Sequence, residues 1–209
     1  GSYLECQDFW RISGIERDVY LWSQPKTALK DFRVISTLDD QYKDGIFTLS
    51  MDLRNNSSQP AQLTALYELL DREGKVVATS SEQIHLKAGG VETVNFQKTL
   101  PDVRTWTSED PQLYQLLMTL QKAGQTIEIV PFPVGFRKFE IRQIAEKDAN
   151  GHPYSVFMVN GQPIKLKGVN IHEHNPLTGH YVTEELMRKD FELMKQNNLN
   201  SVRLCHYPQ

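Results

Sequence analysis

An alternation of apolar and polar side chains, from about residue 29 to residue 142, is the feature that most constrains the fold of this chain. The segment 47–53 reads Phe-Thr-Leu-Ser-Met-Asp-Leu, and a period of two places alternate side chains on one buried face of a strand. Further strands are predicted at 63–70, 76–86, 91–100, 114–121 and 126–132. Turn residues stand between them, as at 71–74 and 122–125.

Seven or so short strands at this spacing, over roughly 100 residues, are typical of an antiparallel immunoglobulin-like β-sandwich. The two cysteines, Cys6 and Cys205, lie near opposite ends of the chain. They fit no zinc spacing, and we interpret both as free thiols. An apolar core without a disulfide must therefore stabilise the sandwich.

Charge and hydropathy disfavour two classes of partner. The formal net charge is -3 and the pI is about 6.1, and the interspersed charges form no basic stripe for nucleic acid. The longest apolar stretches have the length of a strand, far below the roughly 20 residues that cross a bilayer. We therefore expect neither nucleic acid nor a membrane as partner.

The pattern changes on both sides of the sandwich. Upstream, only 18–22 is a plausible strand, and the segment is too short for a core of its own. Downstream, 156–160 and 164–169 predict a hairpin across Asn160-Gly-Gln-Pro163. A helix is then expected from the N-cap Thr183 to Asn197, followed by a strand at 199–204.

These patterns predict a mainly β chain. Residues 25–142 would form the immunoglobulin-like sandwich, and residues 143–209 would begin a parallel α/β barrel or a layered sheet that stops after its second strand. Residues 1–24 would be the tail of a preceding domain. A single strand-helix-strand unit cannot bury both of its faces, so we expect it to pack on the sandwich or on a second copy, as in a homo-oligomer.

Candidate functional residues gather where the predicted barrel strands end, which is where barrels build their active sites. His172, Glu173 and His174 follow the first of these strands, and Arg203 and His206 end the second. Histidine and arginine suit a polyhydroxylated or anionic ligand. Each histidine could equally be an ordinary loop or capping residue.

Three other readings of these segments are disfavoured. A zinc site is disfavoured because His172, His174 and His180 show no recognised zinc spacing. A nucleophilic Cys205 activated by His206 is disfavoured because adjacent residues of a strand point to opposite faces. The aromatic segment 106–114 precedes a sandwich strand and contains a turn proline, so packing is favoured over a sugar platform.

Several motifs resemble family-2 glycoside hydrolases, in particular bacterial β-galactosidases. Ser2–Arg11 and 13–19 resemble the end of the sugar-binding domain of this family, and 106–114 and 134–138 resemble landmarks of its sandwich. The segments 160–164, 167–176, 194–198 and 202–208 resemble the opening of its catalytic barrel. The resemblance covers essentially the whole chain, and the His-Glu-His-Asn-Pro run leans toward galactosidases.

This resemblance implies that residues 1–24 are the tail of a jelly-roll sugar-binding domain, and that residues 143–209 are the first β-α-β portion of a TIM barrel, truncated after its second strand. It also implies site roles: Asp8 would contact galactosyl hydroxyls and a sodium ion, His172 and His206 would lie in the substrate pocket, and Arg203 would support the nucleophile or the sugar. Two positions depart from the family pattern: Ile171 replaces a basic residue, and Gln209 replaces an asparagine.

The implied activity belongs to a longer protein. Retaining glycosidases use two carboxyl groups about 5 Å apart, and in this family both are glutamates of later barrel strands. We therefore expect no catalytic residue in this chain, and no turnover by it alone. The whole protein would hydrolyse terminal β-D-galactosides, in a bacterial cytoplasm or periplasm. It would use magnesium and sodium, neither of which this chain would hold tightly.

Two alternatives remain open at this stage. The complete sandwich fits a non-catalytic carbohydrate-binding or scaffold module. The same fold and mechanism would also fit a family-2 β-glucuronidase or β-mannosidase.

Overall fold

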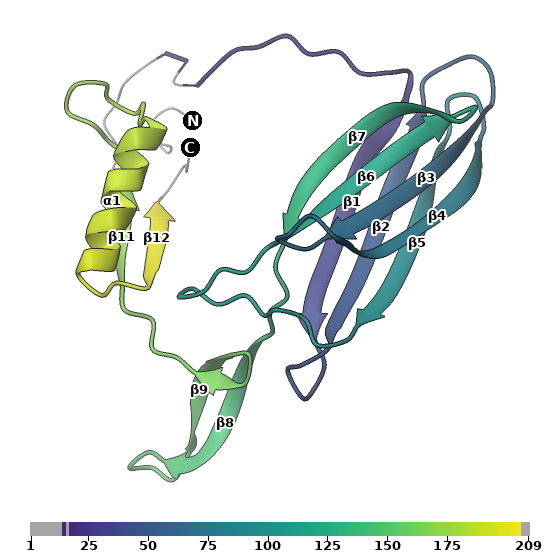
Figure 1. The fold of residues 1–209 in the computed structure, drawn as a ribbon. Helices are drawn as coiled ribbons and strands as arrows, with labels where there is room; N and C mark the ends of the chain where they lie inside the picture. The colour runs from purple at the N-terminus through teal and green to yellow at the C-terminus, as the bar shows by residue number, and fades with distance from the viewer. Residues whose placement is uncertain (1–13, 16, 206–209) are drawn as a thin grey trace. The chain divides into compact units, whose positions relative to one another are not determined.

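The structure, a computed structural model, describes residues 14, 15 and 17–205. Its residues group into two compact units: Ser23–Ile164 forms one, and the second contains the described residues from Lys165 onward. The first unit holds a sandwich and a hairpin, and the second holds a strand-helix-strand unit. Figure 1 shows the elements of both units.

Two antiparallel sheets form the sandwich. One has the order β1-β2-β5, with β1 at Thr27–Leu38, β2 at Gly45–Asn55 and β5 at Val91–Leu100. The other has the order β4-β3-β6-β7, with β3 at Ala61–Leu70, β4 at Val76–Leu86, β6 at Tyr114–Lys122 and β7 at Gln125–Val134. The predicted mainly β, immunoglobulin-like fold is confirmed, and the strand predictions agree within a few residues.

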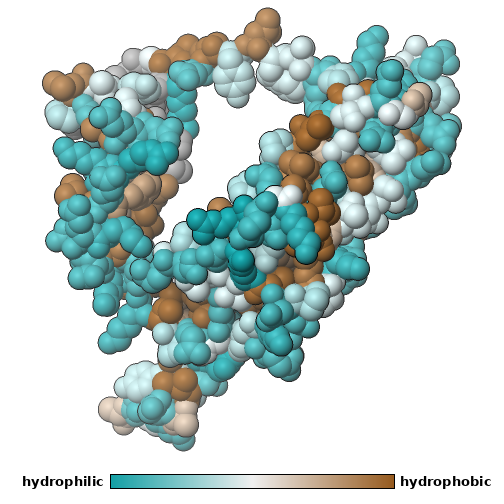
Figure 2. Space-filling model, in the orientation of Figure 1, coloured by the Kyte–Doolittle hydropathy of each residue, from teal (hydrophilic) through white to brown (hydrophobic). Residues whose placement is uncertain are grey.

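The core lies between these sheets and follows the sequence alternation. In β2 every second side chain, from Phe47 to Leu53, is fully buried. Tyr67 of β3 lies in the middle, with its ring centroid 5.3 Å from that of Phe47 and 5.1 Å from that of Phe96. Burial raises the pKa of the Tyr67 hydroxyl. Polar side chains occupy most of the visible outer surface of the sandwich (Figure 2).

A three-stranded sheet follows the sandwich, with the order β10-β9-β8. It comprises β8 (Phe139–Lys147), β9 (Pro153–Val159) and the two-residue β10 (Gln162–Pro163). The predicted turn is present, since Asn160 and Gly161 have φ of 48° and 75°. The predicted partner strand at 164–169 is wrong, because β9 pairs mainly with β8 and only the two residues of β10 pair with its other edge. The last backbone bond on that edge joins the Ile164 N–H to the Phe157 carbonyl at 2.9 Å.

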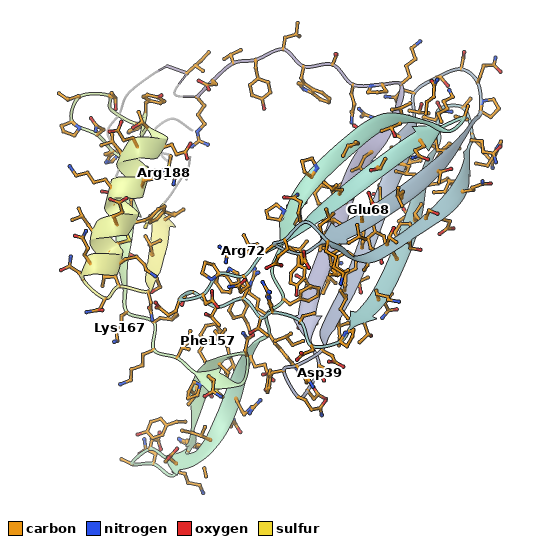
Figure 3. The ribbon with its side chains drawn as sticks, in the orientation of Figure 1. Asp39, Glu68, Arg72, Phe157, Lys167 and Arg188 are labelled. Carbon is orange, nitrogen blue, oxygen red and sulfur yellow. The ribbon has the colours of Figure 1, made fainter. Side chains whose placement is uncertain are left out.

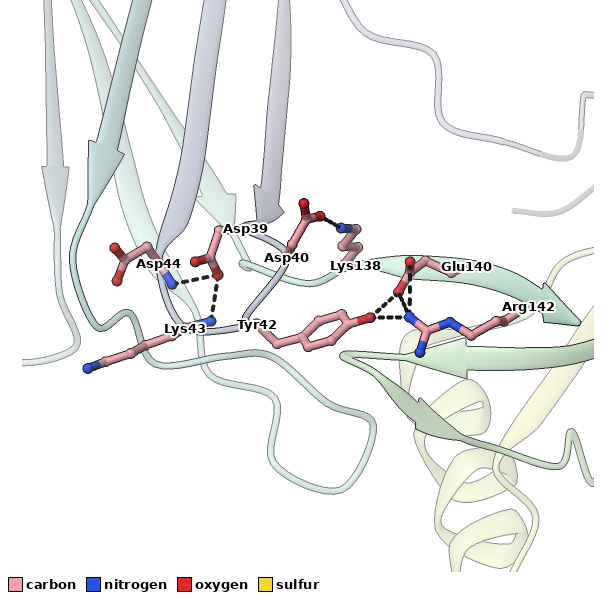
Figure 4. A network of polar contacts seen from close by, with 8 residues as sticks. All are labelled: Asp39, Asp40, Tyr42, Lys43, Asp44, Lys138, Glu140 and Arg142. Carbon is pink, nitrogen blue, oxygen red and sulfur yellow. Dashed lines mark hydrogen bonds and ion pairs between the residues drawn. The ribbon is translucent and has the colours of Figure 1, made fainter. Parts of the chain in front are cut away.

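A network of polar contacts joins this sheet to the β1–β2 turn of the sandwich (Figure 4). The Tyr42 hydroxyl donates to Glu140 at 2.7 Å and accepts from Arg142. Lys138 forms an ion pair with Asp40 at 2.9 Å. The sheet is therefore anchored to the sandwich through side chains, which explains why Ser23–Ile164 forms one compact unit.

The second unit contains β11 (Gly168–His172), α1 (Glu184–Gln196) and β12 (Ser201–Cys205). β11 and β12 pair in parallel, as predicted, although the first strand begins at Gly168 and not at residue 164. The Thr183 side chain accepts a hydrogen bond from the Leu186 backbone N–H at 3.3 Å, so the predicted N-cap is confirmed.

The strand predicted at 18–22 is wrong, because these residues form no strand in the structure. Val19, Tyr20 and Leu21 are 80%, 79% and 101% exposed, so their apolar character alone does not make them a strand.

The three-stranded sheet of β8, β9 and β10 lies within the same compact unit as the sandwich. The domain boundaries at residues 24 and 142 stay predictions.

Candidate functional site

The register of the β11–β12 pair determines which side chains share a face. Asn170 lies beside Arg203, and His172 lies beside Cys205. Because side chains alternate along a strand, these four residues share one face of the pair. The intervening residues on the opposite face are apolar: Val169, Ile171, Val202 and Leu204.

The apolar face packs toward α1. Ile171 and Leu204 line a cavity of about 30 Å³ together with Met187 and Phe191 of the helix, and the end of β11 at His172 also borders it. In an α/β barrel the helix covers the outside of the strands, and the other strand face points to the interior. The polar face is therefore the one that a barrel would turn inward.

The structure brings together two of the four residues predicted to bind substrate. His172 is the last residue of β11, and not a residue beyond the strand end. Arg203 is the third residue of the five-residue β12, so its predicted place at the strand end is wrong. Its guanidinium Nη1 donates to the Cys205 thiol at 2.9 Å. Asp8 and His206 lie outside the described residues, and their roles stay predictions.

Asn200 is a residue that the sequence reasoning missed. Its amide nitrogen donates to the carbonyl of Lys165 at 2.8 Å, and its carbonyl accepts from the Lys167 backbone N–H at 2.8 Å. These bonds hold the segment that enters β11 against the start of β12. The only sequence signal was an asparagine as the second residue of the strand predicted at 199–204, a residue type that is depleted in strands.

A row of three histidine rings continues from the end of β11. The ring centroids of His172 and His174 are 6.1 Å apart with planes at 16°, and those of His174 and His180 are 4.9 Å apart at 21°. The pKa of His174 is lowered from its usual 6.5, first by burial and then by the nearby His180 and His172. The middle ring is therefore mainly neutral at pH 7.

The described residues contain no group of three His, Cys, Asp or Glu side chains arranged to hold a metal ion. The described residues thus form no binding site for magnesium, and the predicted sodium ligand Asp8 lies outside them. The helix described in the structure is too short and too polar to span a membrane.

Trp106 packs within the first unit. The Arg137 guanidinium lies 4.9 Å from the centroid of its ring, and the Asn160 amide donates to its backbone carbonyl at 3.0 Å. Its place is thus beside the hairpin turn, consistent with the packing role favoured by the sequence.

A sandwich followed by a parallel strand-helix-strand unit, with polar residues on the strand face away from the helix, defines a modular protein with a barrel domain. Residues 27–137 match the family model described as "Glycosyl hydrolases family 2", and residues 153–209 match "Glycosyl hydrolases family 2, TIM barrel domain". The chain belongs to glycosyl hydrolase family 2, as the sequence motifs indicated.

Relatives and solved structures support this assignment. The chain is 39% identical over its whole length to a β-galactosidase of Halalkalibacterium halodurans, and 40% identical over 99% of its length to one of Priestia megaterium. It spans 19% of the length of each. A Bacteroides uniformis β-glucuronidase structure aligns with a TM-score of 0.84 at 25% identity, covering 97% of this chain and 24% of that one. A putative β-galactosidase of Bacteroides fragilis aligns at 0.78, also 25% identical, covering 89% and 27%.

Proposed function

We propose that the whole protein to which this chain belongs is a retaining β-galactosidase that removes terminal β-D-galactose from β-galactosides. The support is the 39% and 40% identity to proteins named β-galactosidase over nearly all of the chain. The structures named β-glucuronidase are similar in fold at 25% identity. The structure of a putative β-galactosidase is also 25% identical, so the choice of galactose rests on the relatives that are 39% and 40% identical.

The observation that carries this proposal is the shared face of His172 and Arg203 on β11 and β12. A neutral imidazole both donates and accepts hydrogen bonds, as a sugar hydroxyl does, and a guanidinium offers a rigid fork of donors. In our proposal His172 contacts the galactosyl hydroxyls, and Arg203 supports the nucleophile or the sugar. Asp8 and His206 complete the pocket, with Asp8 also holding sodium.

Retention needs an acid/base carboxyl and a nucleophilic carboxylate about 5 Å apart. We propose that both are glutamates supplied by other parts of the whole protein, as is magnesium, and that the 209-residue chain alone hydrolyses nothing. The 19% coverage of the relatives is consistent with this view. Because the pocket is then assembled from several domains, the chain alone should also bind galactosides poorly.

A panel of aryl β-glycosides tests the whole protein. Preferred turnover of the galactoside is expected, whereas preference for the glucuronide would keep the fold and the mechanism but exclude the galactose assignment. Absence of turnover, combined with galactoside binding by the 209-residue chain in calorimetry, would favour the carbohydrate-binding module instead.

Substitution of Arg203 tests the site itself. Losing a charged hydrogen bond at a reacting centre costs about 1.5–3 kcal/mol, so Arg203→Ala in the whole protein should lower kcat/KM at least about tenfold. The matched control is Arg188→Ala, since Arg188 lies on α1 (Figure 3) with a 73% exposed side chain that is paired with Glu184 of the same helix. Equal activity of the two variants would exclude the proposed role of Arg203.

A further inference from the structure

The loop between β11 and α1 contains a tight turn that brings Gly179 back to Asn175. Asn175 and Gly179 exchange two backbone hydrogen bonds, each of 2.8 Å. The Asn175 side chain accepts a further bond from the Leu177 backbone N–H at 2.8 Å, and Gly179 has a φ of 71°, which favours glycine. This closed turn brings His180 back beside His174.

The returning ring stacks on a ring that is neutral. His174 and His180 lie 4.9 Å apart with planes at 21°, which is close to an offset stack of aromatic rings. Since the pKa of His174 is lowered by burial and by the neighbouring rings, no positive charge on this middle ring opposes the contact at pH 7. The stack then continues, with wider spacing, to His172 at the strand end.

His172 sits at the last position of β11, where backbone pairing with β12 ends. A side chain at such a position has several accessible rotamers, and each would point its ring nitrogens differently. The backbone N–H of His174 donates to the carbonyl of His172 at 2.8 Å, so the chain turns at once and places the His174 ring beside that of His172. The neighbouring ring thus restricts the orientations open to His172.

We propose that His174 and His180 are positioning residues, which hold the His172 imidazole by ring stacking in the orientation from which it contacts the sugar. The part concerning the sugar rests on the proposed function, whereas the stacking itself concerns this chain alone. Only shape and planarity are required of His180, so an aromatic ring without nitrogens should replace it. A role in proton transfer would instead require the nitrogens.

The experiment compares His180→Ala with His180→Phe, and uses the exposed His85 of β4 as the control position, in His85→Ala. In the 209-residue chain, labelled imidazole nitrogens are followed by NMR. His180→Ala should shift the ring signals of His172 while leaving the amide signals of α1 in place, and His180→Phe and His85→Ala should leave the His172 signals at their native positions.

In the whole protein, kinetics on an aryl β-galactoside provide the second measurement. Misplacement of a binding group by a fraction of an ångström should raise KM about tenfold in His180→Ala, with a smaller change in kcat, and His180→Phe should restore the KM. His172 signals that stay unchanged in His180→Ala, or a failure of Phe to rescue, would overturn the positioning role. If the native whole protein lacks galactosidase activity, the proposed function fails, and the NMR result alone decides the stacking proposal.

Discussion

Replacement of Gly161 by alanine tests whether the hairpin turn is seated on the sandwich as the structure shows. Gly161 has a φ of 75°, a conformation that costs an L-residue about 1–2 kcal/mol. An added Cβ would also lie 2.5 to 2.9 Å from three ring atoms of Tyr42. The Tyr42 ring cannot move aside freely, because its hydroxyl bonds Glu140 and Arg142.

The size of the effect follows from these two causes. Forcing a methyl group into packed surroundings costs about 1–3 kcal/mol, in addition to the backbone strain. Gly74→Ala is the matched control, since Gly74 has a φ of 81° and an added Cβ there would meet nothing within 4 Å. The control should lose about 1–2 kcal/mol, and Gly161→Ala should lose about 1–3 kcal/mol more than the control.

Urea unfolding measures this difference. Tryptophan fluorescence follows Trp106 in a background where Trp10 and Trp22 are phenylalanine, because Trp106 packs beside the turn. In a Tyr42→Ala background the excess cost of Gly161→Ala should vanish, as a double-mutant cycle requires for a direct contact. Equal losses of unfolding free energy for Gly161→Ala and Gly74→Ala in the native background would refute the contact between the turn and Tyr42.

Three further changes probe the other joints of the fold. Thr183→Ala should cost about 1 kcal/mol through loss of the α1 cap, seen as faster hydrogen exchange of first-turn amides, whereas Thr183→Ser should not. Gly168→Ala should loosen the β11–β12 pair, because the added Cβ meets the Ser201 side chain and lies 2.9 Å from its carbonyl oxygen; faster exchange of β12 amides would show this. The pKa of Glu140 is lowered, mainly by the Tyr42 hydrogen bond, so this contribution to stability is present above pH 4.5 and lost as the pH falls below it. Tyr42→Phe should accordingly weaken the acid dependence of urea unfolding, and an unchanged dependence would contradict the assignment.

The sandwich was predictable because its strands carry a strict period of two and its turns carry their own chemistry. The pairing of β9 with β8 was missed. Phe139 and Ile141 alternate as a strand requires, yet strand propensity does not say which neighbour a strand will choose. The missed signal was local, because the turn at Asp148–His152 joins β8 directly to β9. In this turn the Asp148 carbonyl accepts from the Gly151 backbone N–H at 3.0 Å, and the Asp148 carboxylate accepts from the His152 backbone N–H at 2.9 Å.

The residue types of the candidate site were predictable, but their arrangement was only partly so. His172 was expected just beyond a strand end and is the last residue of β11, whereas Arg203 was expected at a strand end and is the third residue of β12. The shift arises because β11 begins at Gly168, where only glycine allows the approach of Ser201. The contact between His174 and His180 depends on the hydrogen bonds between Asn175 and Gly179 in the loop. Such bonds follow no periodic sequence pattern and were not predicted.

The face on which the functional residues lie is thus decided by residues that have no chemistry of their own. A slip of one residue between β11 and a sheet partner moves every side chain to the other face, which would turn His172 toward α1 and Ile171 toward the interior. Two features oppose this slip: the close approach at Gly168, and the pair of Asn200 side-chain bonds to Lys165 and Lys167. The register of this short strand pair, and so the presentation of His172 and Arg203 together, is therefore fixed from the strand ends that lie farthest from the candidate site.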